Sequence, residues 1–278
     1  MPDIYGSHFE YAGVSSRIYG LIIANVETSR FTQISGAING VSVFNKNVKK
    51  RYLIDDDYTD FPISYEVEII TDDDSTLDMN KRREIEKWLF NKHDYRRFYI
   101  DIDDDTDGET YEVINGIQRR LYLNCRFVNA TRLEYNGGIV GFRATIEADS
   151  GLWWQEPVTD KYMLGSYEYT NVIHVNVDSD IDDYIYPKVT IKMRSTNSSN
   201  LEVTIINSTD DSTRLTKFVG LSTNATIVLN GELNSVSGQY YEKFVNQNFP
   251  RLLDGDNMIT VIGDVEEIWF EYSNRRAL

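Results

Sequence analysis

The chain has little of what disulfide-stabilised, secreted or membrane-spanning proteins need. Its 278 residues include one cysteine, Cys125, so no internal disulfide can form. No run of about 18 apolar residues occurs, which excludes a transmembrane helix. The N-terminal residues 1–5 have neither a basic region nor an apolar core, so we predict no secretory signal peptide and synthesis in a cytoplasm.

Basic residues are also scarce. The chain has 28 lysines and arginines against 44 aspartates and glutamates, and its formal net charge is −16. Such a surface repels phosphates, so we expect no general binding of nucleic acid. Only 5 prolines and a hydrophobic content of 41% exclude a disordered or fibrous chain and indicate a globular protein with a sizeable core.

Cys125 alternates with apolar residues on one side of a predicted strand, where a free cysteine behaves as a small hydrophobic side chain. A nucleophilic role needs a neighbouring base, and the three histidines are scattered at 8, 93 and 174. We therefore predict that Cys125 packs in a core.

Most of the chain alternates between apolar and polar residues with period two, which is typical of half-buried antiparallel strands. Residues 98–102 and 111–113 flank an acidic segment and suggest a hairpin, and Asn136-Gly137-Gly138 predicts a tight turn between two further strands. The predicted strands of the first half are 63–69, 98–102, 111–113, 121–127, 133–135 and 140–146.

One segment has helical spacing instead. Ile85, Trp88 and Leu89 fall on one side of a predicted helix near residues 77–92, and Ser75 with Asp78 is typical of a helix start. A single helix among strands indicates that it covers the face of a sheet.

The sequence changes character near 151–157, and we place a domain boundary there. Residues 1–152 form the predicted first domain and residues 153–278 the second. Strands at 189–193, 201–206, 218–221 and 226–229 follow, so the predicted fold class is mainly β, with two antiparallel β-sandwich domains.

The acidic segment Asp103–Gly108 is the best metal candidate, because its carboxylates alternate and a glycine stands at the sixth position, as in calcium loops. The twelfth position is Ile114, where such a loop needs a glutamate, so a solvated hairpin tip is the preferred interpretation. The runs Asp55–Asp57 and Asp72–Asp74 are interpreted as loops.

No motif points to an enzyme. The sequence contains no glycine-rich phosphate loop, no zinc-ligand spacing and no nucleophile elbow, so we predict no catalytic, cofactor or metal residues. Two aromatic pairs, Trp153-Trp154 and Tyr240-Tyr241, could stack on sugar rings if exposed, although such pairs more often lie in a core or an interface.

Several segments of the chain, taken together in their order along the sequence, resemble the distal tail proteins of long-tailed phages with non-contractile tails. The first has an aromatic residue, a glycine, a serine and then Tyr-Gly, and the last combines Phe-Pro with an Asp-Gly turn. The segments are Phe9 to Gly20, Arg82 to Phe98, Val140 to Trp154, Tyr186 to Ile191, and Phe249 to Asn257 with Gly263 to Arg275.

The resemblance implies an N-terminal β-sandwich with a single helix and a projecting hairpin, and a C-terminal sandwich like that of galectins or carbohydrate-binding modules. It also implies a structural virion protein at the distal tail tip, in a six-fold ring. Expected partners are other copies of the chain, the tail tube, a tail-tip spike, fibre or lysin protein, and the tape-measure protein. Neither a cofactor nor membrane insertion is implied.

Two points stay open. The alternative function is carbohydrate binding through the C-terminal sandwich in host-surface recognition, because fold alone does not choose between these roles. If the chain forms a ring through which DNA passes unbound, the acidic runs near 55–57, 72–74 and 101–109 could line the channel and repel phosphates; equally, they could face outward and keep the ring soluble.

Overall fold

The fold is known from a computed structural model, and the chain divides into two compact units. The structure describes residues 6–26, 37–45, 50–59, 62–73, 75–101, 110–114, 116–165, 169–181, 183–197 and 200–276. The first unit extends through Gln155 and the second runs from Glu156 to Arg276. Trp153, which the predicted boundary places in the second domain, packs in the core of the first unit.

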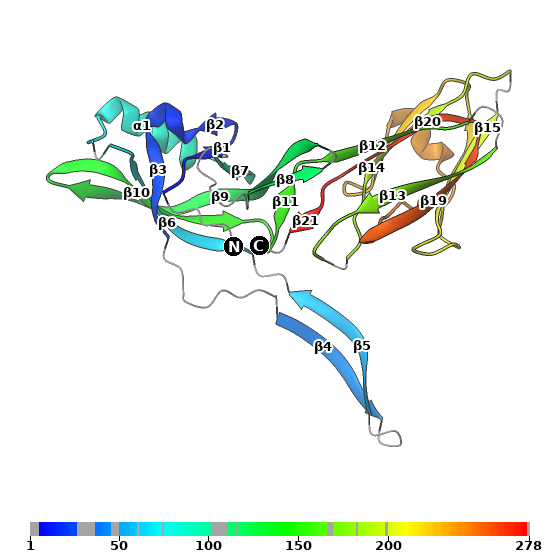
Figure 1. Cartoon of the computed structure of the whole chain (residues 1–278), viewed down its shortest axis with the longest axis horizontal. Helices are drawn as coiled ribbons and strands as arrows, with labels where there is room; N and C mark the ends of the chain where they lie inside the picture. Colours follow the sequence, from blue (N-terminus) through cyan, green and yellow to red (C-terminus); the bar gives the residue numbers. More distant parts are fainter. Residues whose placement is uncertain are drawn as a thin grey trace. The chain divides into compact units, whose positions relative to one another are not determined.

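The first unit is built on one antiparallel sheet in the order β2-β1-β7-β9-β10-β6-β3 (Figure 1). Two short strands, β8 and β11, pair with β9 outside this path. The strands are β1 (Phe9–Tyr11), β2 (Val14–Ser15), β3 (Leu21–Val26), β6 (Ser64–Thr71), β7 (Arg96–Ile100), β8 (Tyr111–Ile114), β9 (Ile117–Tyr135), β10 (Gly138–Ala148) and β11 (Trp153–Gln155). A 3-10 helix, η1 (Ser16–Tyr19), precedes β3.

The sheet curls back on itself. The Gly6 N–H donates to the Ile23 carbonyl (2.7 Å) and the Ile23 N–H donates to the Ser7 carbonyl (3.1 Å), so β3 meets the segment that leads into β1. Alternation along the strands turns apolar side chains to the inside, as the buried-exposed pattern of β6 shows. The first unit therefore closes around a single aromatic-rich core.

Helix α1 (Met79–Leu89) confirms the predicted helix and its buried face of Ile85, Trp88 and Leu89. The residue that caps it is Asp78, whose carboxylate accepts hydrogen bonds from the backbone N–H groups of Asn80 (2.8 Å) and Lys81 (2.9 Å). The helix thus starts after Asp78.

Trp88 attaches the helix to the first strand. Its indole N–H donates to the Tyr11 carbonyl (2.8 Å), and its ring stacks on Phe9 (centroids 5.8 Å apart) and Tyr19 (5.3 Å). Both partners belong to the Phe9–Gly20 segment that resembles distal tail proteins. Phe9 is therefore a core residue that contacts the helix, and Tyr19 is a partly buried residue that covers the same tryptophan.

The predicted hairpin between residues 98–102 and 111–113 is wrong. β7 pairs with β1 and β9, whereas β8 pairs with the beginning of β9, Tyr111 lying opposite Arg120. Alternation locates strands but carries no information about which strands pair. The turn at Asn136-Gly137 is confirmed: both residues have positive φ (49° and 80°), and the turn joins β9 to β10.

The run Asp55–Asp57 lies within a strand, so its prediction as a loop is wrong. β4 (Ala37–Asn45) and β5 (Lys50–Thr59) form a two-stranded antiparallel sheet of their own. Val41, Gly40 and Asn39 stand opposite Asp55, Asp56 and Asp57 in the backbone register of this pair of strands. Aspartate disfavours strands, which is why the run alone suggested a loop.

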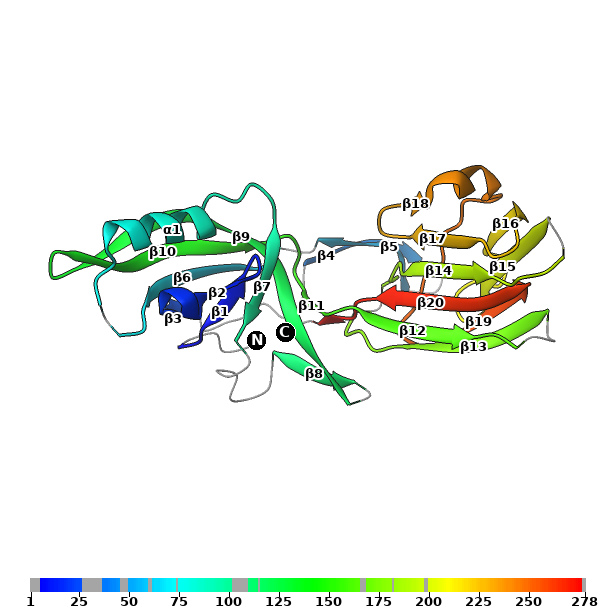
Figure 2. The same ribbon diagram turned by 90° about the horizontal axis from the view of Figure 1, so that it is seen from above.

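The second unit is a β-sandwich, in agreement with the predicted fold class, and all its strand pairs are antiparallel (Figure 2). One sheet has the order β12-β20-β14-β17-β18 and the other β13-β19-β15-β16. The strands are β12 (Val158–Met163), β13 (Thr170–Val177), β14 (Lys188–Met193), β15 (Leu201–Asn207), β16 (Leu215–Leu221), β17 (Thr226–Asn230), β18 (Ser235–Val236), β19 (Gly255–Gly263) and β20 (Val265–Tyr272), followed by β21 (Arg275–Arg276); η3 (Gly238–Lys243) is a 3-10 helix.

Two tyrosines join the sheets along the edge strand β13. The Tyr272 hydroxyl donates to the Asn176 carbonyl (2.8 Å), and the Tyr162 hydroxyl donates to the His174 carbonyl. Both carbonyls belong to an edge strand, which has a row of backbone groups without a strand to pair with. The two hydroxyls therefore protect this edge and hold the sheets together.

Replacing Trp88 by Ala should lower the free energy of unfolding of the first unit by about 3–5 kcal/mol, because the change removes a buried ring and leaves a cavity. Urea unfolding followed by circular dichroism measures this. Lys87→Ala, on the exposed side of the same helix, is the control and should change stability by less than about 0.5 kcal/mol. A loss below about 1 kcal/mol for Trp88→Ala would show that the Trp88 ring is not packed in this core.

Stability should fall steeply between pH 10 and pH 12. Burial raises the pKa of Tyr65 to about 12 and that of Tyr162 to about 12, and it also raises the pKa values of Tyr11 and Tyr272. Because the unfolded chain releases these protons near pH 10 and the folded chain holds them longer, the stabilisation is complete below pH 10 and is lost as pH rises.

For the buried Tyr65, the change in pKa from 10 to about 12 corresponds to roughly 3 kcal/mol. Urea unfolding at pH 9, 10, 11 and 12 should show a shallower dependence on pH in Tyr65→Phe than in the unmodified chain. Tyr241→Phe, at an exposed position, should leave the dependence unchanged. Equal pH dependence in all three chains would contradict this assignment.

Candidate functional site

The acidic segment Asp103–Gly108, the calcium candidate, lies outside the described residues. Within the described part of the chain, no group of three or more His, Cys, Asp or Glu side chains could hold a metal ion. In that same part, no helix has the length and apolar character needed to cross a membrane.

The other acidic runs have different local structures. Asp55–Asp57 stand in β5, as described above. Asp72 and Asp73 lie in a turn after β6, where the Ser75 hydroxyl and N–H bond to Asp73 and hold the pKa of this carboxyl below its usual range. Asp74 lies outside the described residues. The lining of a channel by these runs stays a prediction.

The aromatic pairs proposed for sugar stacking are mostly buried. Trp153 is completely buried in the core of the first unit, and Tyr240 is only 8% exposed. Neither of these two rings is therefore open to a ligand. Trp154 is half-buried and its indole N–H donates to the Ser150 hydroxyl (3.2 Å), while Tyr241 is 54% exposed. Of the four residues, Tyr241 alone has a largely exposed side chain.

Cys125 is buried, as predicted, and lies in the core of the first unit. Burial raises the pKa of its thiol well above the usual range, and the Asp149 carboxylate adds to the effect. A thiol held in the neutral form is a poor nucleophile and a poor metal ligand.

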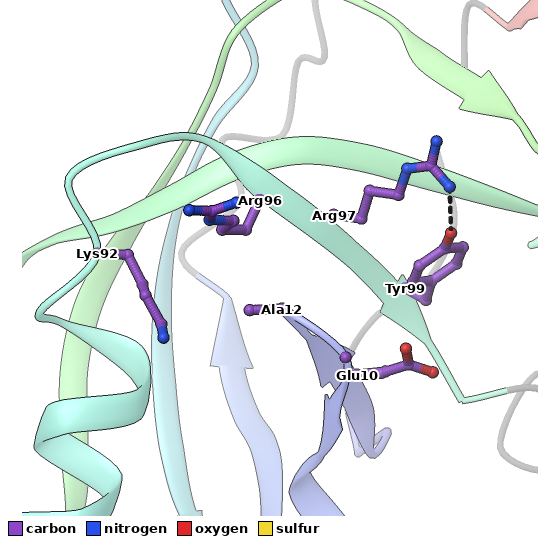
Figure 3. Close-up of a pocket in the computed structure, with 7 residues that line it drawn as sticks. Glu10, Ala12, Lys92, Arg96, Arg97 and Tyr99 are labelled. Atoms are coloured by element: carbon purple, nitrogen blue, oxygen red, sulfur yellow. Dashed lines mark hydrogen bonds between the residues drawn. The ribbon is translucent and has the colours of Figure 1, made fainter.

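An open hollow of about 410 Å³ lies on the outer face of β1 and β7 (Figure 3). Lys92 comes from the segment after α1, and Ala12 and Gly13 form the turn between β1 and β2. The other residues that line the hollow are Glu10, Arg96, Arg97 and Tyr99. With Lys92, the lining has three cationic side chains, and it has no serine, cysteine or histidine. The hollow therefore lacks a nucleophile paired with a base.

Stacked rings and cations build the wall beside the hollow. The Arg97 guanidinium lies 4.5 Å from the Tyr122 ring centre, and that of Arg120 lies 4.1 Å from the Tyr99 ring centre. Arg120 also donates to the Glu10 carboxylate (2.9 Å), which joins β9 to β1 across β7. These contacts stabilise the outer face of the sheet, so the arrangement is that of a packed surface.

The segment Phe249–Asn257 is held by one buried amide. The Asn257 side-chain oxygen accepts from the Leu253 N–H (2.9 Å) and from the Asn207 side chain (2.8 Å). Its NH₂ group donates to the Leu253 (2.8 Å) and Gly255 (3.1 Å) carbonyls. Asn257 is completely buried with its hydrogen bonds satisfied, so the segment is a structural loop.

Two family models match the chain in order. One is described as a phage tail protein N-terminal domain and matches residues 4–150, and the other is described as a phage tail C-terminal domain and matches residues 158–272. The chain belongs to this family of phage tail proteins. No curated protein sequence is significantly similar to it.

The fold of this phage tail protein occurs in solved structures with low sequence identity. The SPP1 Dit protein, described as a hub adsorption apparatus of phages that infect Gram-positive bacteria, is 12% identical and aligns over 97% of this chain and 98% of its own, with a TM-score of 0.63. A chain of the phage P2 baseplate is 9% identical and aligns over 98% and 99%, with a TM-score of 0.50. The family models and the shared fold together bear out the resemblance to distal tail proteins at the level of the fold.

The turn Ala12-Gly13 offers a test of local strain in this tail protein. Ala12 has φ +53° and Gly13 has φ +78°, a left-handed conformation that costs a residue with a Cβ about 1–2 kcal/mol. Ala12→Gly should therefore raise the free energy of unfolding by about 0.5–1 kcal/mol, although it removes a half-buried methyl group.

Gly13→Ala is the matched variant. A Cβ at Gly13 would meet no atom within 4 Å, so only the backbone conformation opposes it. This variant should lower stability by about 1 kcal/mol in the same urea unfolding experiment. Destabilisation by both changes would show that the Ala12 methyl group matters more than its backbone conformation.

Proposed function

We propose that this phage tail protein is a distal tail protein, a structural hub that joins the tail tube to the proteins of the tail tip. The observation that carries the proposal is the match of both phage tail domains, in order, over residues 4–150 and 158–272. The likeness in fold to SPP1 Dit over 97% of the chain supports it.

The hub is proposed to be a homo-oligomeric ring, most simply six-fold, formed by domain 1–152. Head-to-tail contacts between identical subunits either close into a ring or continue as a filament, and a tail terminus requires closure. A permanent contact of this kind should bury more than about 1,000 Å².

The proposed partners follow from this position. The ring contacts the tail tube on one side and a tail-tip spike, fibre or lysin protein on the other, with the tape-measure protein and DNA passing through it. The protein is proposed to assemble in the host cytoplasm and to act without catalysis. The net charge of −16 supports a passage that does not retain DNA, because carboxylates repel phosphates.

Cryo-electron microscopy of intact virions tests the hub. We expect six copies per tail in a closed ring at the distal end of the tube. Antibodies against the purified chain should label that end alone. A single copy per tail, a dimer, or labelling along the whole tube would contradict the proposal. The mass of the purified chain is a poor test, since a subunit without its tube template can stay monomeric.

A further inference from the structure

A single tryptophan lies at the centre of one outer face of the second unit. Trp269, on β20, stands directly opposite Lys161 on β12 and Thr190 on β14. These three strands lie side by side (Figure 2). The neighbours of Trp269 along the strand, Ile268 and Phe270, are completely buried in the sandwich core, so the indole points outward, where it is half-buried.

The indole is surrounded by charged groups held in place by one another. The Lys161 ammonium lies 4.8 Å from the ring centre and 2.8 Å from the Glu267 carboxylate. Lys192 pairs with Glu266 (3.1 Å) and with Glu267 (3.6 Å). On the other side of the ring along the strand, Glu271 pairs with Lys188 (3.2 Å).

Glu267 is the most restrained of these groups. Its side chain is only 12% exposed, and hydrogen bonds and charge from Lys161 and Lys192 hold the pKa of its carboxyl below the usual range. It is therefore ionised at neutral pH, and it stands two residues before Trp269 on the same face of β20. Thr190 adds a hydroxyl group on the opposite strand.

The balance of charge indicates the class of ligand. Three ammonium groups (Lys161, Lys188 and Lys192) stand against three carboxylates (Glu266, Glu267 and Glu271), so the face has no net charge with which to attract an anion or a cation. A saccharide has an apolar C–H face that can lie on an indole, and hydroxyl groups that both donate and accept hydrogen bonds. An aromatic ring with carboxylates and ammonium groups on the neighbouring positions of the same sheet face complements both features.

We propose that the outer face of the β12-β20-β14 sheet binds a neutral saccharide, with Trp269 as the stacking surface and Glu267, Glu271 and Lys161 as hydrogen-bonding groups. Lys161 moves from above the indole when the sugar ring takes its place; its side chain is 46% exposed, which leaves room for this movement. The proposal concerns the second unit alone and is independent of the ring.

Titration of the purified full chain with lactose, cellobiose and di-N-acetylchitobiose tests the site. We expect at least one of these neutral disaccharides to bind with a dissociation constant in the millimolar range, seen by saturation-transfer NMR and by a change in tryptophan fluorescence. Trp269→Ala should weaken that binding by more than about tenfold. Tyr241→Ala, which removes an exposed ring elsewhere in the same unit, should leave it unchanged.

Glu267→Gln keeps the shape of the site and removes a charge, so it provides a second readout if Trp269→Ala unfolds; it should weaken binding several-fold. Between 50 and 500 mM salt the affinity of the unmodified chain should change less than about twofold, because the ligand is neutral. The proposal is overturned if none of the three sugars binds at 20 mM, or if binding persists in Glu267→Gln and in a folded Trp269→Ala chain.

Discussion

The first unit depends on the pairing of one strand. β9 contains 19 residues and forms hydrogen-bonded ladders with β7, β10, β8 and β11. Its inner face supplies Leu121, Leu123, Cys125 and Phe127 to the core, where Phe127 contacts the rings of Phe9, Tyr11 and Phe98. A shift of β9 by one residue would turn these side chains to solvent and break four pairings together.

On the outer faces of both units, cationic side chains lie over aromatic rings. In the first unit Arg97 and Arg120 cover Tyr122 and Tyr99, whose rings are almost completely buried. In the second unit Lys161 covers Trp269, which stays half-buried. In the first arrangement the tyrosine rings are almost completely covered, which suits a structural role, while the second leaves an indole within reach of a ligand. Both occur in a protein of a phage tail family.

Local patterns were enough to predict many elements. The spacing of Ile85, Trp88 and Leu89 predicted the helix, and Asn136-Gly137 predicted the turn between β9 and β10, because both signals act between residues close in the chain. The pairing of β7 was mispredicted because its partners, β1 and β9, are chosen by contacts between segments far apart in the sequence. Asp55–Asp57 were mispredicted because strand pairing overrides the low preference of aspartate for strands.

The sequence by itself determined the mainly β character, the helix, the core position of Cys125 and the resemblance to distal tail proteins, since alternation and turn residues act locally and the family segments occur in order along the chain. Only the tertiary structure decided which aromatic rings are accessible. Trp153 and Trp269 both lie in strands that alternate, yet the first is completely buried and the second faces outward. Alternation with period two shows that a strand has two different faces. Which face is buried depends on the strands and helices that pack against it, and these are not specified by the local pattern.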